Sequence, residues 1–158
     1  TASAVYRNGR RPFGSSRARV RPDMLAWWGG AQTGYIHVQS HLRVPTPLTM
    51  VSTWDGDELS LVREHHQLRA ARTLDLAPAV AALDQVVAAA REGGLEADGL
   101  GLYRVIRAGE RADELAAALL DRGLRVRAFA GGGIAVAPPL DRAAALAGRI
   151  AAVLREAL

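Results

Sequence analysis

Four histidines are the first candidates for chemistry in this sequence. An extended segment would place positions 37 and 41 on one face, but the turn at Pro45 and the preceding Leu42 interrupt that geometry. Adjacent positions on a helix point about 100° apart, so positions 65 and 66 do not converge on one ion. We therefore interpret all four as solvated side chains rather than as a metal cluster: His37, His41, His65 and His66.

Two short segments offer backbone amides. Residues 52–58 place the hydroxyls of Ser52 and Thr53 at a predicted helix start, where capping by Ser52, Thr53 or Asp55 is the simplest interpretation. Three glycines at 131–133 lie between two predicted strands, whereas a phosphate-binding loop joins a strand to a helix. We interpret the glycines as a turn.

Cysteine and lysine are both absent from the sequence, and their absence excludes several kinds of chemistry. The chain has no cysteine, which removes disulfides, thiolate nucleophiles and cysteine-based zinc sites. All 20 basic residues are arginine. Without a lysine side chain, no enzyme mechanism that uses a lysine Schiff base is available to this chain.

Length and composition fit a folded domain. The chain has 158 residues, 49% hydrophobic and 23% charged, which allows one domain with a core or two very small ones and excludes collagen-like or fully disordered chains. No window approaches the roughly 18 to 20 apolar residues of a membrane span. We expect a cytoplasmic protein.

The elements expected to position these residues differ between the two parts of the chain. Residues 1–54 are irregular, with short candidate strands and no helix pattern. Two helices are predicted next, then a tail in the order β-α-β-β-α with two helices on one face of the sheet. The candidate strands of the first part are Ala2–Tyr6, Met24–Trp28 and Tyr35–Val38, and the later elements are helices at 58–74 and 77–90, a strand at 100–106, a helix at 110–120, strands at 124–129 and 134–137, and a helix from the N-cap candidate Asp141 to Leu158.

Charge is concentrated at the start of the chain. Residues 1–50 hold seven arginines and one acid, Asp23. A basic arm with interleaved Tyr6 and Phe13 permits binding of nucleic acid through phosphate contacts and stacking. The alternative, which we favour because the arm has no periodicity or known motif, is a solvated or partner-facing segment.

The order of short motifs resembles the C-terminal portion of class III aminotransferases, the ornithine, acetylornithine, GABA and lysine-6 type. These pyridoxal-phosphate enzymes have the aspartate-aminotransferase fold (fold type I). The resemblance therefore implies an α/β fold, the last part of a large-domain sheet followed by a small α+β C-terminal domain. Four stretches carry it: 9–14 with 20–27 (GRRPFG and VRPDMLAW), 52–59 (STWDGDEL), 99–102 (GLGL), and 114–140, which runs from EL through DRGL to PPL.

The departures from the family pattern concern its hallmark residues. The resemblance places Gly29 or Gly30 at the lysine that forms the internal aldimine, so we expect no catalytic residue in this chain. It places Ser3 at the aspartate of the pyridinium nitrogen and Ala137 at the arginine that clamps the substrate carboxylate. Thr53 matches the threonine that reaches the cofactor phosphate of the neighbouring subunit; with Ser52 it is our cofactor-binding prediction.

Family members are also much longer, and the missing part is most of the large domain. We expect residues 1–54 to be a remnant of the large-domain sheet, 55–92 linking helices and 93–158 the small domain. Strands cut from a larger sheet leave edges and apolar faces exposed, so we expect a homo- or hetero-oligomer with a lysine-bearing chain. A first residue other than Met adds the expectation of a split or processed enzyme.

Three functions follow from this sequence. The first is an aminotransferase-like subunit or fragment, inactive alone, that completes a pyridoxal 5'-phosphate site in a partner chain. The second is a degenerate homologue that acts as a binding or scaffolding module. The third is an Arg-rich nucleic-acid-binding protein. The amino donor and acceptor are not predicted.

Overall fold

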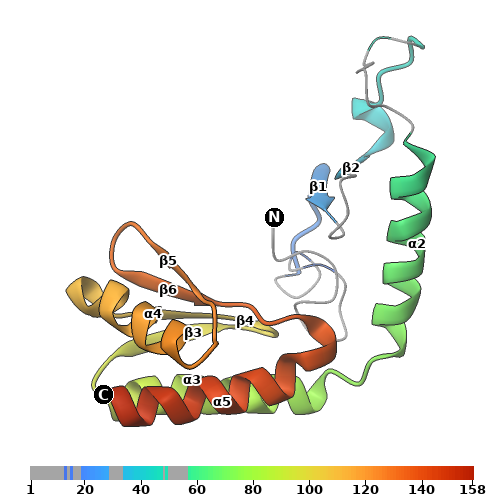
Figure 1. The fold of residues 1–158 in the computed structure, drawn as a ribbon. Helices are drawn as coiled ribbons and strands as arrows, with labels where there is room; N and C mark the ends of the chain where they lie inside the picture. The colour runs from blue at the N-terminus through green and yellow to red at the C-terminus, as the bar shows by residue number, and fades with distance from the viewer. Residues whose placement is uncertain (1–12, 14, 16–18, 29–33, 48, 50–56) are drawn as a thin grey trace. The chain divides into compact units, whose positions relative to one another are not determined.

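The protein is described by a computed structural model that covers residues 13, 15, 19–28, 34–47, 49 and 57–158 (Figure 1). The chain forms two compact units, and among the described residues the change from one to the other falls between Thr73 and Leu74. Each unit is described by itself below.

The first unit contains an antiparallel hairpin. Strand β1 spans Met24–Trp28 and pairs along its whole length with β2, Gly34–Val38. A short 3-10 turn, η1, follows at Ser40–Leu42. The strands predicted at 24–28 and 35–38 are therefore confirmed, and the one predicted at Ala2–Tyr6 lies outside the described residues.

Helix α2, Glu58–Thr73, completes the described part of this unit. Its N-terminus is capped by Asp57, whose Oδ1 accepts hydrogen bonds from the backbone N–H groups of Leu59 (3.2 Å) and Ser60 (3.4 Å). The predicted capping residues at positions 52, 53 and 55 lie outside the described part. Asp57 directly precedes the helix, where its short carboxylate reaches the unpaired amides.

The second unit is a four-stranded antiparallel sheet with helices packed on it (Figure 1). The strand order is β3-β4-β6-β5. Helices α3 and α5 pack side by side, α3 also contacts β3 and β4, and α4 contacts α5, β5 and β6. The elements are α3 (Ala77–Glu92), β3 (Glu96–Leu100), β4 (Tyr103–Arg107), η2 (Gly109–Arg111), α4 (Ala112–Asp121), β5 (Arg127–Phe129), β6 (Gly133–Val136), η3 (Leu140–Arg142) and α5 (Ala143–Ala157).

The prediction of a single strand at 100–106 is wrong, because the chain forms a hairpin there. Strand β3 ends at Leu100 and β4 begins at Tyr103, so the unit reads β-β-α-β-β-α with α3 in front of it. Gly99 and Gly101 have φ values of +139° and +58°, which L side chains rarely adopt and which allow the tight reversal. The polar run before Gly99 gave no strand signal in the sequence.

Two smaller predictions at turns have opposite outcomes. The glycines at 131–133 form the predicted turn, with φ of +90° at Gly131 and +75° at Gly132 before β6 starts at Gly133. Asp141 is not the N-cap of the last helix. It lies inside the turn η3, and Arg142 stands at the N-cap of α5 without a side-chain hydrogen bond.

The core of the second unit lies between one face of the sheet and the helices. Alternate residues of β4 are buried, and the register places Ile106 in one row with the buried Ala97 of β3 and Ile134 of β6. In the described part of the chain no single helix is long and apolar enough to span a membrane. The largest fully buried apolar side chains are Leu83, Val86, Leu102, Ile106, Leu115, Leu119, Ile134, Val136 and Leu154.

Candidate functional site

Most residues predicted for a cofactor site lie outside the described part of the structure. These are Ser3, Gly29, Gly30, Ser52 and Thr53. The structure describes the residues that flank them: β1 ends at Trp28, one residue before the position matched to the lysine, and α2 begins at Glu58. The predictions for Ser52 and Thr53 stay predictions.

Ala137 is the one departing hallmark position that the structure describes. It follows β6 directly, is exposed, and precedes Pro138 and Pro139. A methyl side chain offers no hydrogen-bond donor, whereas a guanidinium holds a carboxylate with two parallel N–H bonds. Ala137 therefore cannot bind a substrate carboxylate through its side chain.

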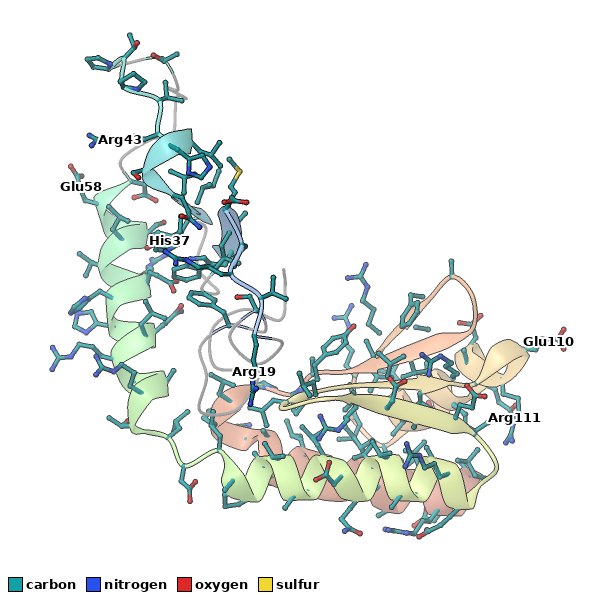
Figure 2. All side chains as sticks on the ribbon, turned by 180° about the vertical axis from the view of Figure 1, so that it is seen from behind. Arg19, His37, Arg43, Glu58, Glu110 and Arg111 are labelled. Atoms are coloured by element: carbon teal, nitrogen blue, oxygen red, sulfur yellow. The ribbon has the colours of Figure 1, made fainter. Side chains whose placement is uncertain are left out.

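An aromatic cluster occupies one face of the hairpin. The rings of Trp27 and Tyr35 are stacked with centroids 4.4 Å apart and 16° between their planes. Phe13 lies 5.6 Å from Trp27, and His37, labelled in Figure 2, stacks on Trp27 at 6.0 Å. Trp27 is buried, and its Nε1 has no hydrogen-bond partner among the described residues. Such a cluster stabilises the hairpin through apolar burial and ring contacts.

The same unit buries a carboxylate that the sequence did not indicate. Glu64 of α2 is 1% exposed, and Ser60 one turn before it is 2% exposed. Burial raises the pKa of Tyr35, and the Glu64 charge raises it further. The sequence signal was weak, because Glu64 stands in a charged run where a solvated position is expected.

At the start of α2, hydrogen bonding lowers the pKa of a carboxyl group, that of Asp57. The Ser60 hydroxyl, followed by the Ser60 backbone amide, lowers the pKa of Asp57 below its ordinary value of 3.8. A carboxylate that accepts these bonds serves the helix end rather than proton transfer, since it is held in its charged form. Asp57 is therefore a capping residue.

The second unit buries one cation. The Arg104 guanidinium donates to the carbonyls of Gly101 (2.7 Å) and Tyr103 (3.1 Å) and to Asp84 Oδ1 (2.7 Å). Alternation along β4 was the signal that could have found it, because Arg104 stands between the inward positions Leu102 and Ile106. The Asp84 contact joins β4 to α3, and the two carbonyl contacts hold the turn before β4, so Arg104 is a structural residue.

Within the described ranges, the titratable groups do not assemble a catalytic arrangement. No group of three His, Asp or Glu side chains is placed to hold a metal ion there. His41 Nε2 lies 3.8 Å from Asp23 Oδ1, with both side chains mostly exposed. Glu110, in the turn η2, points away from the body of its unit (Figure 2).

The residues present do not fit a self-contained pyridoxal-phosphate site. The group requires a side-chain amine for its covalent link, and the whole sequence has no lysine. The position matched to the substrate clamp is Ala137, which has no donor. No reaction step through this cofactor can be assigned to the chain alone.

Comparison with known proteins finds the fold but no relative by sequence. No protein-family model matches the chain, and the search of curated proteins also finds no match. Solved structures do match: lysine aminotransferase from M. tuberculosis in the internal aldimine form has a TM-score of 0.82 and 22% identity, and ornithine aminotransferase from Toxoplasma gondii has 0.80 and 20%. Acetylornithine aminotransferase from Elizabethkingia anophelis has a TM-score of 0.74 and 16% identity.

The shares of each chain that match are unequal. These three likenesses cover 97%, 98% and 98% of this chain but 39%, 42% and 45% of the aminotransferases. The chain thus spans about two fifths of the length of the proteins that it resembles. Identities this low establish the fold alone, and they confirm the predicted fold class: this chain has the fold of the C-terminal part of class III, fold type I, pyridoxal-phosphate-dependent aminotransferases.

Proposed function

We propose that this chain is an aminotransferase-like subunit, inactive by itself, that completes a pyridoxal 5'-phosphate site in a lysine-bearing partner chain. One observation carries the proposal. Nearly the whole chain matches these aminotransferases, with 97% covered in the lysine aminotransferase likeness, yet the sequence has no lysine. A cofactor held by this fold must take its covalent anchor from a lysine outside this sequence, and we assign that lysine to the partner.

In this proposal the chain contributes hydrogen bonds rather than covalent chemistry. The hydroxyls of Thr53 and Ser52 would donate hydrogen bonds to the cofactor phosphate, the role that the resemblance implies for Thr53. The partner would supply the amine, the proton transfer at the substrate carbon and the substrate carboxylate clamp. The amino donor is then selected by the partner.

The test is a comparison of the isolated chain with the chain as purified from its native cells. Each sample receives pyridoxal 5'-phosphate and then borohydride, and peptide mass spectrometry locates the reduced adduct. We expect an adduct on a lysine of a co-purifying chain and none on a side chain of this one. In the isolated chain, which has no lysine, prior acetylation of the amino terminus removes that group's own reaction with the aldehyde. The native sample is not acetylated, because acetylation would also block a partner's lysine.

Variants at the predicted contacts make the test specific. Thr53→Ala and Ser52→Ala should weaken retention of the cofactor by the complex, because each removes a hydroxyl donor. Thr49→Ala is the matched control, since the Thr49 hydroxyl is exposed and bonds locally to the Thr46 carbonyl. A complex without a lysine adduct, or equal cofactor retention by all three variants, contradicts the proposed function.

A further inference from the structure

One face of the β1–β2 hairpin is apolar and exposed. We call it the hairpin's apolar face; it consists of Met24 and Ala26 of β1 with Ile36 and Val38 of β2. The register pairs Met24 with Val38 and Ala26 with Ile36, so the four side chains form a continuous patch. Met24 is 55%, Ile36 59% and Val38 40% exposed.

The opposite face of the hairpin is already packed. Trp27 is buried there, and Tyr35 and Leu25 are half-buried. An antiparallel sheet with only one covered face normally carries polar residues on the other, because water remains in contact with it. The hairpin's apolar face has no polar residue in its four described positions, so its sequence fits a sheet that is covered on both faces.

The second unit shows what a solvated face looks like in the same chain. The outer face of its sheet carries two exposed apolar residues, Leu100 and Phe129, beside four charged ones, Glu96, Asp98, Arg107 and Arg127. Arg107 Nη1 lies 3.0 Å from Asp98 Oδ2. Charged cross-strand neighbours keep that face in water. The hairpin's apolar face has no such charged side chains. This difference between the two sheets indicates that the face contacts protein rather than water.

Helix α2 of the same unit also has exposed apolar side chains. This helix buries Ser60 and Glu64, whereas Leu59 and Val62 are 59% and 53% exposed. A helix that folds only against its own unit normally buries its apolar stripe. Among the described residues of the first unit, no apolar layer covers these side chains.

The matched structures contain a further protein segment that could cover the hairpin's apolar face. They contain more than twice the length that this chain accounts for, while 97% to 98% of this chain is matched. The unmatched portion of that fold is a protein segment large enough to supply a layer on the hairpin. The face itself has no charge, so its occupant must present apolar side chains rather than a charged surface.

We propose that the hairpin's apolar face is the docking surface for the partner chain that carries the rest of the aminotransferase fold. This inference rests on the proposed function and adds the surface by which the two chains join. Its four side chains would form the dry centre of the interface, and other exposed apolar residues of the first unit would widen it toward the roughly 800 Å² per partner of a stable complex.

The test is an Ile36→Glu variant of the full chain. A carboxylate at the centre of a dry interface is buried without a partner, so binding of the lysine-bearing chain should weaken at least about 30-fold. The control is Leu120→Glu, because Leu120 is 58% exposed but lies on α4 of the second unit. Isothermal titration calorimetry with the purified partner gives the affinities, and thermal unfolding of each isolated variant verifies its fold.

The outcomes separate this inference from the proposed function. Loss of binding in Ile36→Glu alone supports the surface, and it does so even if the partner forms no cofactor adduct, a result that contradicts only the function. Equal binding by both variants overturns the surface, even when the complex carries the adduct. A wild-type dimer of this chain that Ile36→Glu dissociates, with partner binding unchanged, assigns the face to a second copy and also overturns it.

Discussion

The two units of this chain use their apolar residues in opposite ways. In the described part of the first unit the buried apolar residues are Trp27 and Ala71, while Met24, Ile36, Leu59 and Val62 are exposed. The second unit buries apolar residues from Leu76 to Leu154 on both the sheet and the helices. Apolar burial is the main favourable term in folding. The second unit therefore has the features of a self-sufficient fold, whereas the described part of the first unit leaves most of its large apolar side chains exposed.

Paired isoleucines test this contrast most strongly. Ile106 of β4 is 0% exposed and Ile36 of β2 is 59% exposed. Ile106→Ala should lower the free energy of unfolding by about 2 to 5 kcal/mol, since it removes buried carbons and leaves a cavity. Ile36→Ala in the isolated chain should change it by less than about 0.5 kcal/mol. Urea denaturation measures both, and equal losses would contradict the contrast between the units.

Much of the second unit could be predicted from sequence because its patterns and its burial agree. The helix predicted at 77–90 is α3, in which Leu83 and Val86 are buried, and the helix predicted at 110–120 corresponds to α4, which ends shortly before Gly123 with its φ of +70°. The hairpin of β3 and β4 was missed because its first strand is short and polar, and because glycine permits reversals that periodicity does not reveal. Boundaries fixed by turns are local features that a hydrophobic pattern does not contain.

The first unit was less predictable for a physical reason. Its strands alternate between packed aromatics such as Trp27 and exposed apolar residues such as Ile36, so both faces look apolar in sequence. On α2 the apolar positions Leu59 and Val62 are exposed, and Glu64 is buried instead. A sequence pattern records which residues prefer burial, but it does not say which chain provides it. Of the candidate site, the residue types and the missing lysine were readable from sequence; their geometry was not.

Two neighbouring glycines test how tightly the second unit is built. The Gly132 carbonyl accepts hydrogen bonds from the amides of Ala108 (2.8 Å) and Gly109 (3.0 Å), and a Cβ at Gly132 would lie 2.4 Å from the Gly109 Cα. Gly131 also has a positive φ, but a Cβ there meets nothing within 4 Å.

Gly132→Ala should therefore cost about 3 kcal/mol through backbone strain and displaced hydrogen bonds, and Gly131→Ala about 1 kcal/mol through strain alone. Thermal and urea unfolding compare the two variants. A Gly132→Ala variant as stable as Gly131→Ala would show that the turn adapts freely, which is against a tightly packed unit.

Substitution of the buried Arg104 should have a smaller effect on the free energy of unfolding. Arg104→Met should destabilise the chain by about 1 to 3 kcal/mol, because the carbonyls of Gly101 and Tyr103 lose their donors. Asp84→Ala should cost about 1 kcal/mol or less, since the Asp84 side chain is 64% exposed and the guanidinium keeps both carbonyls. A double-mutant cycle in urea separates the pair from the carbonyl bonds. If Asp84→Ala costs as much as Arg104→Met, the ion pair to α3, and not the bonds to the two carbonyls, is the main contribution of Arg104 to stability.

The smallest effect returns to the first unit and concerns the start of α2. The pKa of Asp57 is lower in the folded chain than its ordinary value of 3.8. The stabilisation from the charged carboxylate is therefore fully present above pH 3.8 and is lost as the pH falls through the folded-state pKa. Asn caps helices about as well as Asp and does not titrate in this range, so Asp57→Asn should retain its cap. Circular dichroism at 222 nm should show extra loss of helix in the wild type on acidification. Identical acid profiles would mean that the charge on Asp57 contributes nothing to the stability of α2.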